Sequence, residues 1–304
     1  MAIQSVEKLI EMIVDRMRGQ ARQAGVDRAQ VDISGGIDSA TVAALAVRAF
    51  GPDKVVGVYS GINSTEESRR LARLVAERFD FPLVELELSE AYRLIVDATR
   101  REFERLGLPF PDENAPAHRT AFGGLRSCLR APVGRFVNRA FGGGIRQGTG
   151  NRDEDELLRF YQKGGDGEVD NNWIAGLFKS EVWELAASLG VPQEVIDATP
   201  TPDLWGTGQS HTDESELEQL TGVALTYTRP GSPMGTIEWA SRENERNGCI
   251  TGAGAAIDPA ELGYTEEQAR VIEAMRRMER VTRHKAELPP QLPREELLAA
   301  GVVT

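Results

Sequence analysis

The sequence has few of the features that define several protein classes. Its 304 residues include only two cysteines, Cys128 and Cys249, which lie far apart and exclude a disulfide framework and a cysteine zinc site. The 35 Lys and Arg residues are outnumbered by 47 Asp and Glu residues, giving a net charge of −12, so we expect no nucleic-acid partner. No apolar run approaches the roughly 20 residues of a membrane span, and Glu7, Lys8 and Glu11 interrupt the N-terminal apolar residues, unlike a secretory signal. We therefore expect a reduced, cytoplasmic protein without a membrane partner.

What the sequence does contain is an alternation of helix and strand signals. The N-terminal segment predicts an amphipathic helix that ends at Gly25, and strand signals follow at Val31–Ile33, Val55–Val58 and Leu83–Leu88. Helices are expected between and behind these strands at 38–50, after a capping box of Ser64 and Glu67, and behind Ser89. Strands separated by helices of this length form βαβ units. We predict an α/β, Rossmann-like fold whose parallel sheet is flanked by helices on both faces.

The rest of the chain is less regular. Residues 107–124 are rich in Pro, Gly, Asn and Ala, which indicates a surface loop or lid. A basic helix is expected at Leu125–Phe141, with Pro132 near its start, either as a solvated helix or as a phosphate-binding one. Further helices are expected at 179–189 and 265–285, the second opened by a capping box of Thr265 and Gln268, and an irregular stretch rich in Gly, Pro, Ser and Thr lies at 200–263.

The most informative local motif is Ser34-Gly35-Gly36-Ile37-Asp38-Ser39, between the first strand and the next helix. Two glycines allow a tight turn, and successive N–H groups at a helix N-terminus bind anions such as a polyphosphate. Asp38 would repel phosphate unless a divalent cation stood between them, which favours Mg²⁺ bound with the pyrophosphate end of ATP. The alternative is a simple βα turn in which Asp38 and Ser39 cap the helix.

Further motifs follow in a fixed order. They are Gly148–Glu154, Phe160–Asp170, Leu177–Val182, Pro200–Trp205, Thr212–Glu214 and the pair His284-Lys285. Together with the first motif, this series resembles the N-type ATP pyrophosphatases and, among them, the ammonia-dependent NAD synthetases, from about Ser5 to Pro290. The resemblance implies an adenine nucleotide alpha hydrolase-like fold. It also implies a single domain over residues 1–304, with ATP, deamido-NAD and ammonia as substrates.

The resemblance assigns a role to each matching residue. Those implied to bind ATP are Ser34, Gly35, Gly36, Ile37, Asp38, Ser39, Thr149, Lys179 and Thr201. Those implied to face deamido-NAD are Arg130, Lys163, Asp166, Asp170, His284 and Lys285. Asp38 and Glu154 would ligate Mg²⁺, and Asp38, Lys179 and Thr201 would act in catalysis.

The residues alone leave alternatives open for several of these roles. Glu154 lies in an acidic run that suits a helix start, and Asp166 and Asp170 suit turns in a Gly-rich loop. His284 alone would suit a surface position. Lys179 opens a helix, the end that the macrodipole makes unfavourable for a cation, which favours a functional reason for it.

The implied reaction is amide formation through an acyl adenylate. The substrate carboxylate attacks the α-phosphate of ATP and releases pyrophosphate, and ammonia then expels AMP. Because only about thirty residues precede the phosphate motif, we expect no glutaminase domain and infer free ammonia or a separate ammonia donor. The resemblance also implies a homodimer, with the first helix and the basic helix after Gly124 at its interface.

Several departures from the family pattern concern the acid substrate. Asp32 stands where the family prefers a small residue, Gln162 replaces a Thr, and Ala286 replaces an Arg. The arginine motif before Gly148 is poorly matched, and residues 227–263 resemble an insertion. The alternative is therefore an amide ligase that adenylates and amidates a different carboxylate. A catalytically silent relative is disfavoured because Asp38 and Glu154 are both present.

Overall fold

The computed structural model describes residues 3–113, 115, 118–202 and 211–302 and contains the predicted parallel α/β fold. Its sheet has the strand order β3-β2-β1-β4, and all three strand pairs are parallel. The strands are β1 (Ala29–Asp32), β2 (Val55–Gly61), β3 (Leu83–Glu87) and β4 (Ile145–Gln147). The first three match the predicted strands. The fourth was not predicted, because it has only three residues and two of them are polar.

The helices cover both faces of the sheet. Along β2, Val55 and Tyr59 pack into the main core, whereas Val56 and Val58 pack with Val137 of α5 on the opposite face. The main core receives α1 (Val6–Ala24), α2 (Ile37–Phe50), α3 (Glu66–Phe79) and α7 (Lys179–Leu189). The other face is covered by α5 (Arg119–Ala140). Alternation along one strand therefore decides which helix each side chain meets.

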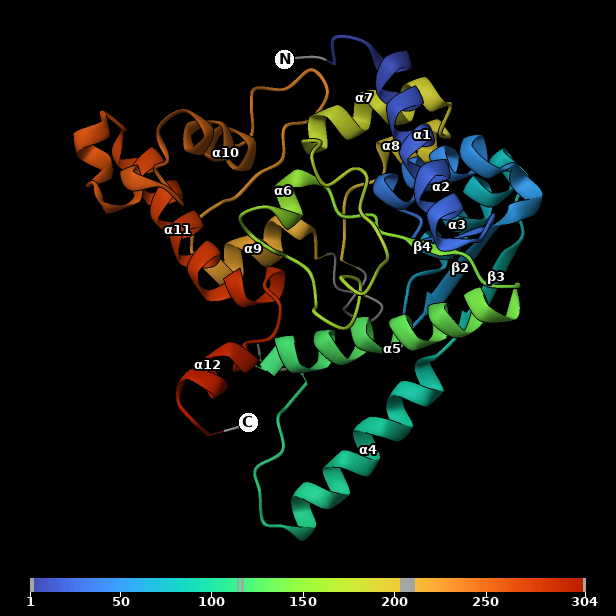
Figure 1. Cartoon of the computed structure of the whole chain (residues 1–304), viewed down its shortest axis with the longest axis horizontal. Helices are drawn as coiled ribbons and strands as arrows, with labels where there is room; N and C mark the ends of the chain where they lie inside the picture. Colours follow the sequence, from blue (N-terminus) through green and yellow to red (C-terminus); the bar gives the residue numbers. More distant parts are fainter. Residues whose placement is uncertain (1–2, 114, 116–117, 203–210, 303–304) are drawn as a thin grey trace.

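The remaining helices form a second group beside the sheet layers. Figure 1 shows α9, α10 and α11 gathered on the side of the molecule away from the sheet, with α6 between. Their bounds are α6 (Arg152–Asp155), α8 (Gln193–Asp197), α9 (Asp213–Thr221), α10 (Thr236–Asn247), α11 (Glu266–Ala286) and α12 (Arg294–Ala299), with short 3₁₀ turns at Pro52–Lys54, Ala253–Ala256 and Pro259–Leu262. The described part of the stretch expected to be irregular at 200–263 therefore contains the α-helices α9 and α10.

Two predicted helix starts need correction. The expected capping box of Ser64 and Glu67 is wrong: Thr65 is the N-cap of α3, and its hydroxyl accepts from the Ser68 amide at 3.1 Å. The basic helix begins at Arg119 rather than at residue 125, so part of the expected loop is helical and Pro132 lies inside the helix. By contrast, the capping box of Thr265 and Gln268 is confirmed.

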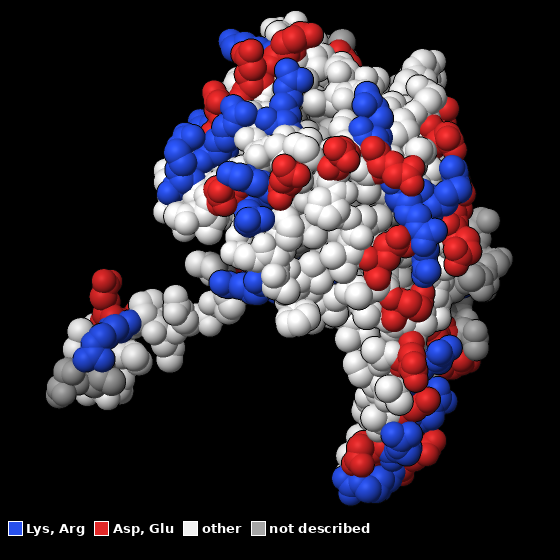
Figure 2. All heavy atoms as spheres, turned by 90° about the vertical axis from the view of Figure 1, so that its right-hand side faces the viewer, with Lys and Arg blue, Asp and Glu red and all other residues white. Residues whose placement is uncertain are grey.

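The molecule has a rounded body with two projections. Helix α4 (Ser89–Arg105) packs on α5 at its base and then points away from the body, as α12 does near the C-terminus (Figure 1). Figure 2 shows that acidic and basic side chains are intermixed on the face it presents, including on the projecting helix. No helix in the described part of the chain is long and apolar enough to cross a membrane.

Candidate active site at the carboxyl edge of the sheet

The loop between β1 and α2 is shaped by its own hydroxyls and glycines. Gly35 has a φ of +87°, and a Cβ there would lie 2.4 Å from the carbonyl oxygen of Ser68, so only glycine fits. The Ser34 hydroxyl accepts from the Gly36 amide at 3.2 Å and lies 3.1 Å from the Ser39 hydroxyl. Gly36 is the N-cap of α2 and offers no capping side chain. The backbone amides at the start of α2 can therefore donate hydrogen bonds to a bound anion.

Three charged side chains meet beside this loop. The Lys179 ammonium lies 2.5 Å from an Asp38 carboxylate oxygen and 2.9 Å from Glu154 Oε1. The Lys179 side chain is only 2% exposed, and the two carboxylates are 17% and 18% exposed. Helix α7 places Lys179 here because its apolar face packs against α2, which carries Asp38. Asp38 and Glu154, the two carboxylates that the sequence assigns to Mg²⁺, therefore both pair with the Lys179 ammonium.

Asn151 joins these groups from the loop after β4. Its side-chain oxygen accepts from the Glu154 amide at 3.2 Å as the N-cap of α6, and its amide nitrogen donates to Asp38 Oδ1 at 3.1 Å. Asn151 is fully buried. A Cβ at the preceding Gly150 would lie 2.2 Å from the Asp155 carboxylate, so glycine is needed for this close approach. The last residue of the Gly-Thr-Gly-Asn motif therefore links the Asp38 carboxylate to the backbone of Glu154.

The site carries an excess of negative charge. Burial lowers the pKa of Lys179, but the charges of Asp38 and Glu154 outweigh burial and the net shift is upward, so the ammonium stays charged. Asp213 is buried in the same region, and burial, followed by the charge of Glu154, raises its pKa to about 7. One lysine thus faces Asp38, Glu154 and a third carboxyl group. An additional cation is electrostatically favoured here, although no three His, Cys, Asp or Glu side chains of the described chain form a ready-made metal site.

A cavity of about 1710 Å³ brings most of the predicted residues together. Its lining runs from the phosphate loop and β2, past α5, to α9 and α11. The predicted residues that line it are Ser34, Gly35, Gly36, Ile37, Asp38, Ser39, Arg130, Thr149, Glu154, Lys163, Asp166, Lys179, Thr201 and Lys285. Asp170 and His284 do not line it. Part of the predicted Pro200–Trp205 motif, from Asp203 onward, lies outside the described residues.

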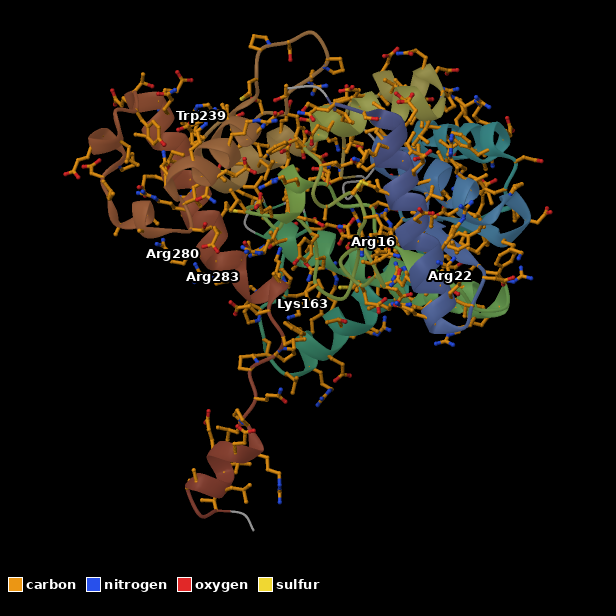
Figure 3. All side chains as sticks on the ribbon, turned by 45° about the horizontal axis from the view of Figure 1, so that its top comes forward. Arg16, Arg22, Lys163, Trp239, Arg280 and Arg283 are labelled. Carbon is orange, nitrogen blue, oxygen red and sulfur yellow. The ribbon has the colours of Figure 1, made fainter. Side chains whose placement is uncertain are left out.

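Lys163 of the Gly-rich loop and Lys285 of α11 each donate hydrogen bonds to backbone carbonyl oxygens of the other's segment. Lys163 donates to the carbonyl oxygens of His284 and Glu287 at the end of α11, at 3.0 and 2.9 Å. Lys285 donates in the other direction, to the carbonyl oxygens of Arg159 and Tyr161, at 2.9 and 2.6 Å. Figure 3 shows Lys163 at the lower end of α11, with Arg283 and Arg280 further up that helix. These four hydrogen bonds join the end of α11 to the Gly-rich loop.

The two predicted aspartates of the Gly-rich loop differ in position. Asp166 accepts from the Ser127 hydroxyl at 2.7 Å and from the Gln162 amide at 2.8 Å, and it lines the cavity. Asp170 instead pairs with Arg135 at 2.8 Å and accepts from the Arg146 amide at 2.7 Å, away from the cavity. The structure therefore gives Asp170 a role in holding the loop on α5 and β4.

Three arginines of the basic helix make polar contacts within the protein, whereas Arg139 is exposed. Arg126 is buried and pairs with Glu113 at 2.7 Å, and Arg135 pairs with Glu168 and Asp170. Arg130 donates to the Ser60 carbonyl oxygen at 3.1 Å and lines the cavity. The solvated-helix interpretation is therefore wrong for Arg126, whereas the Arg135 side chain remains 32% exposed. Of these three arginines, Arg130 lines the cavity.

Sequence reasoning missed three residues that contact or face the charged cluster: Asn151, Asp213 and Tyr227. Asn151 and Asp213 lay inside quoted motifs, where an N-cap asparagine before Arg152-Asp153-Glu154 and an acid after Thr212 could have been assigned. Tyr227 carries no local signal, because a tyrosine between two threonines has no pattern that predicts burial beside a lysine.

The fold and the site together define a class, the parallel α/β nucleotide-binding proteins, with an anion-binding loop and a charged cavity at the carboxyl edge of the sheet. The family follows from comparison with known proteins. The family model for NAD synthase matches residues 9–223, so the chain belongs to the NAD synthase family. The match ends before the segment 227–263 that resembles an insertion in the sequence.

Individual relatives agree with this family over nearly the whole chain. The chain is 32% identical to an NH(3)-dependent NAD(+) synthetase of Methanosarcina acetivorans over 93% of its length and 97% of the relative. It is 29% identical to an enzyme of the same description from Carboxydothermus hydrogenoformans, over 93% and 96%. Among solved structures, NMN synthetase from Francisella tularensis has a TM-score of 0.71 at 21% identity, covering 95% of this chain and 99% of that one. NH3-dependent NAD synthetase from Campylobacter jejuni has a TM-score of 0.66 at 19% identity, covering 95% and 100%. These two structural matches show the fold.

Proposed function

We propose that this protein converts deamido-NAD to NAD, using ATP and ammonia. The observation that carries the proposal is the meeting of Asp38, Glu154 and Lys179 beside the phosphate loop, in a chain of the NAD synthase family. The loop amides at the start of α2 and the hydroxyls of Ser34 and Ser39 would bind the phosphates of ATP. Lys179 would add a positive charge, and Thr149 and Thr201, which line the same cavity, would contact the nucleotide.

We further propose that Mg²⁺ accompanies ATP. The residues fit it, because the carboxylates of Asp38 and Glu154 point at one common cation, and Mg²⁺ is commonly held by one or two carboxylates together with substrate phosphates and water. When bound, Mg²⁺ neutralises negative charge on the phosphates of the leaving pyrophosphate. Asn151 would hold the Asp38 carboxylate through its side-chain amide while it caps the helix that carries Glu154.

The chemistry needs no nucleophile from the protein. An oxygen of the deamido-NAD carboxylate attacks the α-phosphate, a new P–O bond forms, and the bond to pyrophosphate breaks. Ammonia then attacks the acyl carbon, loses a proton and expels AMP. Lys179 stabilises the charge that develops at the phosphates, which is the kind of preorganised electrostatics that contributes most to such reactions. Arg130, Lys163, Asp166 and Lys285 would face deamido-NAD, while Asp170 and His284 would act by holding the walls.

The assembly, the nitrogen source and the compartment are also part of the proposal. A homodimer with α1 and α5 at its interface is supported by Phe136 of α5 and Met12 of α1, whose side chains are exposed to 74% and 55%. Free ammonia, or a separate donor protein, would supply the nitrogen. A cytoplasmic location is supported by Cys128 and Cys249, both free thiols.

The competing possibility is another carboxylate as substrate. It is favoured by Gln162 and Asp32, two departures from the family pattern that both line the cavity. Incubation with ATP, Mg²⁺, ammonium and a panel of acids, followed by measurement of AMP and the amide product, decides between the two. The proposal predicts AMP and NAD with deamido-NAD. AMP formed only with another acid would contradict deamido-NAD as the substrate, and no AMP with any acid would contradict the ligase activity.

A further inference from the structure

Tyr227 contacts two of the three charged side chains of the site, Glu154 and Lys179, from a segment beyond the family-matched residues. Its hydroxyl donates to Glu154 Oε1 at 3.3 Å, the same oxygen that lies 2.9 Å from the Lys179 ammonium. Its ring centroid lies 5.1 Å from that ammonium, within cation–π range. The Tyr227 side chain is buried, with the residue only 3% exposed. One aromatic side chain therefore contacts a candidate metal ligand and the lysine beside it.

The chain around Tyr227 is held firmly in place. The Tyr227 amide donates to the Glu214 carboxylate at 2.9 Å, and the Thr226 and Thr236 side chains each accept from the other's amide, at 3.1 and 2.9 Å. A Cβ at Gly235 would lie 2.4 Å from the Tyr227 carbonyl carbon, so the turn between them is closely packed. The backbone that carries the Tyr227 side chain is therefore held by α9, through Glu214, and by the turn that ends at Thr236.

The same segment also supports the start of α7. Glu238 of α10 accepts from the Ser180 hydroxyl at 2.8 Å, next to Lys179, and pairs with Arg242 at 2.6 Å. Glu238 is only 1% exposed. Residues 226–242 therefore make two contacts at the site. Tyr227 contacts Glu154, and Glu238 contacts Ser180 in the first turn of α7, next to Lys179.

We propose that Tyr227 is a positioning residue for the metal-bound nucleotide: its hydroxyl orients the Glu154 carboxylate, and its ring holds the Lys179 ammonium beside that carboxylate. This inference rests on the proposed function in requiring that Glu154 serves a divalent cation with ATP. The physical reason is general. A donor that fixes the free rotation of a ligating carboxylate lowers the cost of ordering it when the metal binds, and loss of such a partner typically weakens metal binding about 10–100-fold.

The test is calorimetric titration with a non-hydrolysable α,β-methylene analogue of ATP, once as its Mn²⁺ complex and once metal-free in EDTA. Tyr227→Phe removes only the hydroxyl. We expect it to weaken binding of the Mn²⁺ complex about tenfold, the lower end of the range because the 3.3 Å hydrogen bond is long, and to change binding of the metal-free analogue less than twofold. Tyr227→Leu also removes the ring, and we expect it to weaken binding of the metal-free analogue as well.

The matched control is Tyr264→Phe. Tyr264 also donates its hydroxyl to a carboxylate, that of Glu243 at 3.1 Å, but it lies beyond α10 and away from the cavity. We expect wild-type affinity for both forms of the analogue. Equal affinity of Tyr227→Phe and Tyr264→Phe for the Mn²⁺ complex would overturn the positioning role, even if Tyr227→Phe had a lower melting temperature. Should Tyr227→Phe not fold, unchanged binding by Tyr227→Leu would overturn it equally. A wild-type protein that binds the Mn²⁺ complex but makes no NAD would contradict the proposed function alone.

Discussion

Asp38 is a carboxylate placed beside a site suited to phosphate. It lies in the first turn of α2, pairs with Lys179 and accepts from Asn151. Burial raises its pKa and the Lys179 charge lowers it, with a net upward shift. A carboxylate beside an anion site is favourable only if a cation lies between them. At the residue scale, therefore, the charge of Asp38 and the geometry imposed by Asn151 carry the proposed chemistry.

Replacement of Asp38 by Asn tests that charge. The amide is nearly the same size but cannot pair with a cation, so we expect pyrophosphate release to fall by about a hundredfold or more, the effect of losing several kcal/mol of charge stabilisation. The measurement is pyrophosphate formation at saturating ATP with a coupled assay. Turnover at the wild-type rate would contradict the assignment of Asp38 to the metal.

Asn151 allows its two roles to be separated. Asn151→Ala removes both the N-cap of α6 and the contact with Asp38, whereas Asn151→Ser keeps an N-cap oxygen but cannot reach Asp38 as the amide does. We expect Asn151→Ala to lose about 1 kcal/mol of unfolding free energy and Asn151→Ser to regain most of it. We expect both to have much lower activity. Recovery of activity in Asn151→Ser, measured beside its thermal stability, would reduce Asn151 to a helix cap.

Residues differ in how far the sequence could assign them. The phosphate loop was readable because its glycines and hydroxyls are contiguous, so local backbone geometry alone explains them. Lys179 and Glu154 needed the family pattern, since 141 positions separate Lys179 from Asp38 and only the packing of α7 on α2 brings them together. Tyr227 was not assigned, because its position depends on a turn closed by Gly235, far from any motif.

The helices and strands also differ in whether local sequence or tertiary contacts determine their bounds. Helix α7 was predicted with both its ends, because Gly190 in the left-handed region terminates it locally. The start of α5 was predicted too late, because the glycines of its first turns suit a loop in isolation, and burial of Phe122 against α4 favours the helix instead. Strand β4 has its hydrogen bonds supplied by β1, and no periodicity in three residues could indicate that.

Helix α10 is the element whose electrostatic contribution can be measured by pH. Burial raises the pKa of Glu238, but hydrogen bonds from Thr228, Arg242 and Ser180 outweigh it, and the net shift is downward. A carboxyl group with a lowered pKa in the folded state stabilises the protein above its unfolded value of about 4.5, and that contribution is lost as the pH falls below it.

Glu238→Gln should therefore cost about 3 kcal/mol of unfolding free energy at pH 7, because Arg242 is left buried without its counter-ion. The difference from wild type should shrink as the pH falls through about 4.5. Urea unfolding of both proteins at a series of pH values measures this. A difference that stayed constant from pH 7 to pH 4 would contradict the account of the Glu238 ion pair.

At the scale of the whole molecule, a net charge of −12 is compatible with polyanionic substrates because the relevant field is local. The loop amides, Lys179 and the cavity lysines face the ligand at short range, whereas salt screens exposed charges beyond about 8–10 Å. Figure 2 agrees that surface charges are mixed rather than gathered in one acidic face on the side shown. A negative net charge is therefore compatible with a nucleotide ligand.

The proposed homodimer is tested by Phe136→Glu on α5. Phe136 is 74% exposed in the single chain, and a charge at a buried interface would be strongly unfavourable. We expect the wild-type protein to sediment as a dimer and Phe136→Glu to sediment as a folded monomer with an unchanged circular dichroism spectrum. Arg16→Glu on α1 is a second probe of the same interface. Dimers of unchanged stability in both variants would place the interface elsewhere.

Activation of a carboxylate by adenylation in this cavity can be followed by isotope transfer. Deamido-NAD labelled with ¹⁸O in both oxygens of the nicotinate carboxylate is converted with ATP, Mg²⁺ and ammonium, and the products are analysed by mass spectrometry. Attack on the α-phosphate predicts one ¹⁸O atom in every AMP, none in pyrophosphate, and equal amounts of AMP and NAD. Unlabelled AMP, or ADP with labelled phosphate, would contradict it.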